Sequence, residues 1–160
     1  MTGNKNKYSS IPETQAHINT VRFYLIRAIN ILMRKAFNHD ASKMEYPELE
    51  IFDIYTPKLK GMTYGSDEYK KCLEEMAPAL KHHYEANPHH PEYYEGGIKG
   101  MDLLDVIEMF CDWLAATQRH ADGDINKSIV INAGRFGYDE VLVSIFENTV
   151  YSLTRDFVNK

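Results

Sequence analysis

The sequence predicts an all-α protein, a single-domain helical bundle. Its 160 residues suit one domain with one hydrophobic core. Apolar residues recur at three- and four-residue spacing in several segments, as on the buried face of a helix, and residues that commonly cap helices precede these segments. We therefore expect residues 1–160 to form one helical domain, in which residues 1–9 are a flexible N-terminal arm.

The longest predicted helix covers residues 13–37, a stretch without glycine or proline. Ser10 is a suitable N-cap, with Glu13 three residues later. His17 lies in the first turns and is a candidate metal ligand, although a lone histidine there more often belongs to the core or its boundary. It lies beside a stripe of apolar residues at helical spacing, formed by Ile18, Val21, Leu25, Ala28, Ile29, Leu32 and Ala36.

Five shorter helices are predicted after it, and capping or turn residues mark their ends, with Ser66 and Asp102 as predicted N-caps. Pro57 is expected to stop the first of them and Pro78 to kink or restart the second. The glycine-rich stretch 93–100 is expected to be a loop that could overhang a site. The five helices are expected at about residues 47–55, 66–86, 102–119, 125–133 and 139–157, with a loop at 58–65 and a break at 134–137.

The composition narrows the classes of partner and compartment. The formal charge of −5 is spread along the chain without a basic stripe, which disfavours duplex nucleic acid but permits a small anionic ligand. Cys72 and Cys111 fall in two different predicted helices, which indicates reduced thiols and a cytoplasmic protein. No signal-peptide run or stretch of about 18 apolar residues is present, so neither export nor membrane insertion is expected.

A run of histidines indicates a metal centre. His82, His83, His89 and His90 are four of the seven histidines in the chain. Imidazole is the commonest protein ligand for transition metals, and a pair that ends a helix can converge with a pair in the following loop. Periodicity places His83 on the apolar face of its helix and turns His82 from it by about 100 degrees. The alternative is a solvated helix end whose histidines cap carbonyl groups.

A second candidate lies where the longest helix ends. His39 and Asp40 are adjacent there, and Lys43 follows three residues later. An imidazole and a carboxylate at one turn can bind one metal or bridge two, while a lysine can hold an anionic substrate or stabilise transition-state charge. The alternative is an Asp-Ser turn that caps the next helix.

A third candidate is a carboxylate stripe on the helix at 102–119. Asp105, Glu108 and Asp112 are spaced at i, i+3 and i+7, so they share one face of that helix. Their mutual repulsion costs a few tenths of a kcal/mol per pair, which a bound cation would relieve. The alternative is an ordinary solvated face.

These motifs together resemble the HD-domain superfamily. The run His39-Asp40-Ala41-Ser42-Lys43 is similar to its motif His-Asp-x-Gly-Lys, and residues 104–119 resemble the closing helix with its last aspartate ligand. The resemblance covers about residues 37–119. It implies an HD-like helical fold, one or two divalent ions (Mn, Fe, Mg, Co or Zn) and mostly phosphohydrolase activity. The chain also resembles phage and bacterial proteins that carry the His-His-x-x-x-x-x-His-His-Pro-Glu run of residues 82–92.

The resemblance also implies roles for single residues. His39 and Asp40 match motif ligands, one histidine of each later pair matches the intermediate ligands, and Asp105 or Asp112 matches the last one. Lys43 matches the lysine of the motif. The remaining implied roles are phosphate contacts for Arg119, Lys127 and Arg135, and orientation of the water or of a ligand histidine by Glu92 or Glu108.

The sequence departs from the HD pattern in several places. His17 is the only candidate for an earlier histidine ligand, and an unbroken helix would separate it from His39 by 22 residues, about 33 Å. Ala41-Ser42 replaces the usual x-Gly, and the two histidine pairs are closer together than usual. Residues 63–69 are similar to a segment of inositol oxygenase, a di-iron HD-fold enzyme, with Ser66 in the position of a metal-binding histidine.

We therefore expect a metal-dependent phosphohydrolase that acts through a metal-activated water on a small phosphorylated substrate, such as a nucleotide. Two alternatives stay open. One is a non-catalytic helical domain that a metal staples together and that binds a nucleotide or a protein. The other is an iron-dependent oxygenase, because one fold can support both hydrolytic and redox chemistry. The sequence leaves the oligomeric state open.

Overall fold

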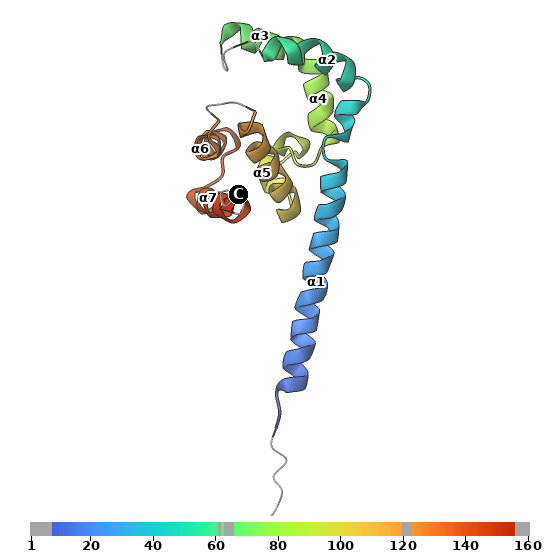
Figure 1. The fold of residues 1–160 in the computed structure, drawn as a ribbon, viewed down its shortest axis with the longest axis vertical. Coiled ribbons are helices and arrows are strands. Elements are labelled where there is room, and N and C mark those ends of the chain that lie inside the picture. The colour runs from blue at the N-terminus through green and yellow to red at the C-terminus, as the bar shows by residue number, and fades with distance from the viewer. Residues whose placement is uncertain (1–7, 61, 63–65, 120–122, 156–160) are drawn as a thin grey trace, which may run out of the picture. The chain divides into compact units, whose positions relative to one another are not determined.

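The computed structural model describes residues 8–60, 62, 66–119 and 123–155, and throughout these residues the regular structure is helical, without a strand. The prediction of an all-α fold is confirmed (Figure 1). The helices are α1 (Ile11–Asn38), α2 (Glu48–Leu59), α3 (Asp67–Glu75), α4 (Ala77–Ala86), α5 (Leu103–Thr117), α6 (Ile125–Phe136) and α7 (Glu140–Thr154). Short 3₁₀ turns follow α1 and α4: η1 (Ala41–Met44), η2 (Pro91–Tyr93) and η3 (Gly97–Gly100).

The chain divides into two compact units, residues 1–37 and residues 38–160. Helix α1 accounts for the first unit and runs without a break to Asn38, and none of its residues is buried. Because α1 is unbroken, His17 lies too far along the helix from His39 to share a metal with it, as the sequence analysis expected for an unbroken helix. Most of the predicted flexible arm, residues 1–7, lies outside the described residues.

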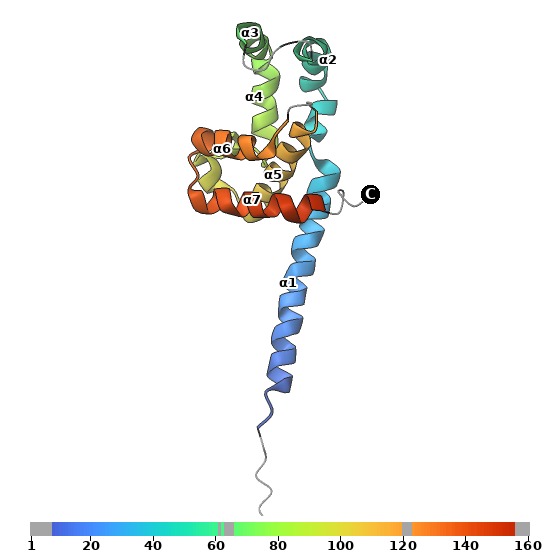
Figure 2. The ribbon, with the colours of Figure 1, turned by 60° about the vertical axis from the view of Figure 1, so that its left-hand side comes forward.

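The core of the second unit lies between α5, α6 and α7. Its buried residues are Met109 and Phe110 from α5, Ile129 from α6 and Phe146 from α7. The rings of Phe110 and Phe146 stack with centroids 4.9 Å apart. Figure 2 shows α6 and α7 side by side, and both cover one side of α5. This packing holds α5 in place, and α5 carries three of the predicted site residues, Asp105, Glu108 and Asp112.

The rest of the second unit is built from α2, α3 and α4, which contact one another. Ser66 caps α3 as predicted, because its Oγ accepts a hydrogen bond from the Tyr69 backbone N–H at 3.1 Å. Pro78 restarts the helix, since α4 begins one residue before it. Met76 and Ala79 are buried at this junction. The restart turns α4 so that its C-terminal end faces the turn after α1, within reach of Ser42.

Two predicted helix ends are wrong. Helix α2 does not stop at Pro57 but runs to Leu59, because the turn after the proline still closes with a bond from the Lys60 N–H to the Thr56 carbonyl (3.2 Å). The predicted break at 134–137 is also wrong in its position. Gly134 is helical, and α6 ends at Phe136, followed by the C-cap Gly137, whose left-handed φ of 70° suits glycine.

The predicted loops are partly ordered by short turns. Residues 58 and 59 of the loop at 58–65 belong to α2, and residues 61 and 63–65, including most of the segment similar to inositol oxygenase, lie outside the described residues. The stretch 93–100 contains the end of η2 and all of η3. In the part of the chain that the structure describes, each helix is too short or too polar to cross a membrane.

Candidate metal centre

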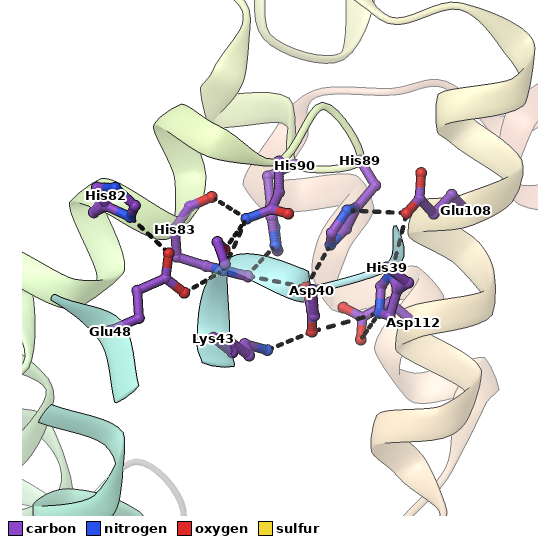
Figure 3. A network of polar contacts seen from close by, with 12 residues as sticks. His39, Asp40, Lys43, Glu48, His82, His83, His89, His90, Glu108 and Asp112 are labelled. Atoms are coloured by element: carbon purple, nitrogen blue, oxygen red, sulfur yellow. Dashed lines mark hydrogen bonds and ion pairs between the residues drawn. The ribbon is translucent and has the colours of Figure 1, made fainter. Parts of the chain in front are cut away.

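Four segments of the second unit bring histidines and carboxylates together. They are the turn before η1, the C-terminal end of α4, the loop between α4 and η2, and the middle of α5. Figure 3 shows their side chains pointing toward one another around Asp40. Asp40 has a left-handed backbone (φ 55°, ψ 21°), which an aspartate tolerates better than most residues. This sharp turn directly after α1 places two adjacent side chains, His39 and Asp40, in one centre.

The Asp40 carboxylate faces histidines on both sides. Its Oδ1 lies 3.4 Å from Nε2 of His83 and 3.4 Å from Nε2 of His89. Its Oδ2 lies 3.4 Å from Nε2 of His39 and 2.6 Å from Nζ of Lys43. In the described structure, Asp40 Oδ1 and His89 Nε2 are buried without a hydrogen-bond partner. Unpartnered buried polar atoms are costly, and a cation between them would satisfy both.

Three overlapping groups of side chains could hold a metal ion, and the ligand atoms of each group lie within 4.8 Å of one another. They are Asp40 with His83, His89 and His90; His39 with Asp40 and Asp112; and His39 with His89 and Glu108. Asp40 belongs to the first two groups, so the arrangement suits one ion or two. His83 Nε2 and His90 Nε2 are only 2.8 Å apart. Nitrogens bound tetrahedrally to one zinc ion at about 2.0–2.1 Å lie about 3.3 Å apart, so these two atoms need to separate by only about half an ångström to share an ion.

The two sides of Asp40 differ in exposure to solvent. The side chains of His83 and His89 are 4% and 2% exposed. Those of His39 and Asp112 are 30% and 26% exposed. The group with His83 and His89 is therefore enclosed, whereas the group with His39 and Asp112 is open to solvent.

Glu108 orients two of the histidines. Its Oε1 lies 3.0 Å from His39 Nδ1 and 3.4 Å from His89 Nδ1. A proton on each Nδ1 that points at this carboxylate leaves Nε2 of both rings free to face Asp40. Asp112 follows one helical turn after Glu108 on α5, so both carboxylates reach the centre from the same face.

Glu48 orients the first histidine pair in the same way, and the sequence analysis missed it. It is the first residue of α2 and is fully buried. Its Oε1 lies 2.7 Å from His82 Nδ1, and its Oε2 lies 2.9 Å from His83 Nδ1. From the sequence it was indistinguishable from any acidic residue in the first turn of a helix, where the dipole favours a negative charge.

Asn87 is a second residue that the sequence analysis missed. Its buried side-chain amide donates to Ser42 Oγ (2.8 Å) and to the His83 carbonyl (2.8 Å). It ties the turn after α1 to the end of α4. Ser42, which departs from the glycine of the HD pattern, therefore has a structural partner. The Asn87-Pro88 dipeptide indicated only a turn in the sequence.

Electrostatics leave part of the centre protonated in the absence of metal. The carboxylates of Asp112 and Glu108 raise the pKa of His39 to about 10. Burial raises the pKa of the Asp40 carboxyl, but His89 and Lys43 outweigh it and hold that pKa well below its usual range. Burial lowers the pKa of His89, but Asp40 and Glu108 outweigh it, so the net shift is upward. A metal ion would therefore compete with protons on His39 and His89.

The other two histidines favour the neutral form that binds metals. Burial and nearby Lys43 lower the pKa of His83. Burial, with His89 and His83 as neighbours, lowers the pKa of His90 to about 3. Neutral imidazoles at both positions can offer Nε2 lone pairs without first losing a proton.

Several predicted site residues lie outside the three groups among the described residues. His82 contacts Glu48 and is 44% exposed. Asp105 completes the capping box of α5 and accepts a hydrogen bond from the Tyr94 hydroxyl at 2.5 Å. The predicted phosphate contacts and Glu92 are exposed: Arg135 pairs with Glu92 (2.6 Å), Lys127 pairs with Asp124 (3.8 Å), and Arg119 lies at the end of α5.

A comparison with models of protein families matches residues 6–157 to DUF5662, a family of unknown function. The match spans most of the chain, so the protein belongs to this family. Neither the curated proteins nor the solved structures give a match.

Proposed function

We propose that this member of the DUF5662 family is a metal-dependent phosphohydrolase that acts on a nucleotide or a related small phosphate ester. One observation carries the proposal. Imidazole and carboxylate groups from four segments converge on Asp40, and two of their buried atoms, Asp40 Oδ1 and His89 Nε2, have no hydrogen-bond partner in the described structure. Mixed nitrogen and oxygen donors of this kind suit Mn, Fe, Co or Zn.

The groups on the two sides of Asp40 would each hold one ion. Asp40, His83, His89 and His90 would hold one ion in the enclosed group. His39, Asp40 and Asp112 would hold a second in the open group. When bound, such ions acidify a water molecule at neutral pH and neutralise the charge on phosphate oxygens.

Lys43 is the cation best placed for a substrate phosphate. Its Nζ lies 2.6 Å from Asp40 Oδ2, and a third of its side chain is exposed. A metal ion on Asp40 would neutralise the carboxylate, and the Lys43 ammonium group could then turn to a phosphate oxygen of the substrate. There it would stabilise the charge that grows on the phosphate or on the leaving oxygen.

Glu108 and Asp112 complete the chemistry on the open side. Glu108 holds His39 and His89 by their Nδ1 atoms, so Nε2 of each ring faces the centre. Glu108 also contacts His39 of the open group, so its carboxylate lies where it can take a proton from the attacking water. The partial exposure of His39 and Asp112 leaves room for a phosphate to approach from solvent.

The sequence resemblance to the HD-domain superfamily supports the same proposal. The residues that carry the resemblance, His39, Asp40 and Asp112, belong to one of the three groups. Of the two aspartates that the sequence left open for the last ligand, Asp112 and not Asp105 lies in that group. We therefore propose an HD-like centre in which Asp112 is the last ligand.

Elemental analysis of the purified protein tests the proposal. Wild type is compared with His39→Ala and His89→Ala, with His17→Ala on α1 as a matched control, and the same samples enter a panel of nucleotides and phosphate esters with added Mn²⁺. We expect stoichiometric metal and hydrolysis in wild type and His17→Ala, loss of both in His89→Ala, and loss of hydrolysis and of the ion in the open group in His39→Ala. Wild type without metal after reconstitution would overturn the proposal.

The panel also separates the two alternatives. Stoichiometric metal without hydrolysis of any phosphate ester would favour a metal-stapled binding domain. A coloured iron protein that takes up oxygen would favour the oxygenase.

A further inference from the structure

We propose that Glu48 is a positioning residue of the centre: its buried carboxylate fixes His83 with the proton on Nδ1 and with Nε2 turned to Asp40 and His90. His82 contacts the other oxygen of Glu48 and holds this carboxylate in place, and it is not a metal ligand. This inference rests on the proposed metal centre, but it does not depend on the reaction that the centre catalyses.

The burial of Glu48 is the first argument. It is fully buried at the start of α2, 34 residues before His82. A buried carboxylate is costly unless donors satisfy its oxygens. The two imidazoles supply one contact to each oxygen, at 2.7 Å from His82 and 2.9 Å from His83. The N-terminal end of α2 also favours a negative charge at this position.

The choice of tautomer follows from the contacts of His83. A carboxylate only accepts hydrogen bonds, so the proton must be on Nδ1, which faces Glu48 Oε2. The Asn87 amide lies 3.0 Å from the same Nδ1, but its two hydrogens go to Ser42 Oγ and to the His83 carbonyl. Neutral His83 therefore carries its lone pair on Nε2. That atom lies 3.4 Å from Asp40 Oδ1 and 2.8 Å from His90 Nε2.

The same geometry assigns His82 a different role from its neighbour. Its Nδ1 is directed to Glu48, nearly half of its side chain is exposed, and it belongs to none of the three groups among the described residues. Adjacent helical residues point about 100 degrees apart, so the pair cannot enter one centre from the same direction. Glu48 reaches both rings with its two oxygens. In the His-His dipeptide, His83 is thus the ligand, and His82 holds the Glu48 carboxylate that orients this ligand.

The comparison with Glu108 supports this assignment. Glu108 contacts Nδ1 of His39 and of His89, and both of these histidines belong to groups that could hold a metal. Carboxylates that accept from the second nitrogen of a metal-binding histidine fix its orientation and raise its basicity. Glu48 has the same relation to His83 on the enclosed side.

The test uses the full chain and two readouts that do not require activity. Long-range ¹H–¹⁵N spectra of the metal-free protein report the tautomer of His83, and titration with Mn²⁺ alone reports metal affinity. Glu48→Gln keeps the size of the side chain but removes the charge and one acceptor oxygen. Glu50→Gln is the matched control, because Glu50 lies in the same first turn of α2 and is exposed.

In wild type and in Glu50→Gln we expect His83 with its proton on Nδ1. In Glu48→Gln we expect a mixture with the Nε2–H form and a loss of Mn²⁺ affinity of about 10- to 100-fold, as for other residues that orient metal ligands. His82→Gln removes a half-exposed residue and is expected to weaken Mn²⁺ binding by a few-fold without loss of metal stoichiometry. It serves as the second variant if Glu48→Gln does not fold.

Three results would overturn the inference: an Nε2–H His83 in wild type, an Mn²⁺ affinity of Glu48→Gln equal to that of wild type, or loss of a whole metal equivalent in His82→Gln. These results are independent of hydrolysis. If Glu48→Gln behaves as expected and no phosphate ester is cleaved, the proposed function fails while the role of Glu48 stands.

Discussion

The two sides of Asp40 differ in their donor groups and in their exposure to solvent. On one side, His83, His89 and His90 are packed around Oδ1 with almost no exposure of the first two. On the other, His39 faces Oδ2 and contacts Asp112, and both of these side chains remain partly open to solvent. An enclosed set of three imidazoles, two of which favour the neutral form because burial lowers the pKa of His83 and His90, is suited to retain an ion. An open set that includes a second carboxylate is suited to exchange water and substrate. Under the proposed function, Asp40 would link a group that retains an ion to a group that exchanges water and substrate.

The largest effect is expected from Asp40→Asn, because Asp40 faces both sides. Asparagine tolerates the left-handed backbone at this position, so the turn should persist while the negative charge is lost. We expect loss of metal from both groups and a fall in hydrolysis of more than about 100-fold, beyond the effect typical of a residue that only orients a ligand. Elemental analysis and phosphate release measure the two losses.

Asp53→Asn is the control for this variant, since Asp53 is an exposed aspartate on α2. Full metal content in a folded Asp40→Asn protein would remove Asp40 from the centre and with it the distinction between the two sides.

Lys43→Met is expected to lower turnover without loss of metal. Lys43 contacts Asp40 but belongs to none of the metal-binding groups among the described residues. Loss of one charged group that stabilises the transition state costs about 100-fold in kcat. Steady-state kinetics and metal content, measured against the exposed Lys99→Met, check this. A variant that loses metal and turnover together would show that Lys43 only supports Asp40.

A pair of variants separates the two sides by smaller effects. His90 belongs only to the enclosed group and Asp112 only to the open one. His90→Ala should lose the ion that survives dialysis, whereas Asp112→Ala should keep about one ion per chain and need about 10- to 100-fold more added Mn²⁺ for hydrolysis. Identical metal content in the two variants would mean that the sides act as one site.

Local patterns explain why most of the fold could be predicted from the sequence. Ser66 and Asp102 were recognised as caps because the signal lies within three residues of the helix start. Pro57 and Gly134 misled the prediction because each lies within three residues of the end of its helix, where the turn after the proline still closes at Lys60 and the glycine costs only about 1 kcal/mol. A breaker residue near a helix end therefore marks that end only to within about one turn.

Those residues of the candidate centre that form local motifs could be predicted from the sequence. Those that packing brings in from another helix could not. His39 and Asp40 are adjacent, and periodicity turned His83 inward. Glu48 reaches the centre only because α2 packs on α4, which no local pattern records. Asp105 shares the helical face of Asp112, but seven residues of helix separate the two by about 10 Å, so only one of them can reach the same ion.

The smallest expected effect is the pH dependence of metal binding. It distinguishes the two sides because their histidines differ in whether they carry a proton that the metal must displace. The pKa of His39 is raised from 6.5 to about 10, so this ring holds a proton at pH 7 and must release it before Nε2 can bind a metal. In the metal-free protein, the raised pKa contributes stability that is fully present below pH 6.5 and is lost as the pH rises through about 10. Metal binding has the opposite dependence: each displaced proton increases the apparent affinity about tenfold per pH unit over this range.

We therefore expect Mn²⁺ affinity to rise between pH 7 and pH 9, and the slope of log affinity against pH to fall by about one in His39→Gln. The residual slope in that variant reports other protons, including the one on His89, whose pKa is also raised. His90→Gln should leave the slope unchanged although it weakens binding, because burial lowers the pKa of His90 to about 3 and the ring has no proton to release. Equal slopes in wild type and His39→Gln would place His39 outside the metal's coordination, and the open side would then be a solvated ion pair next to a single enclosed site.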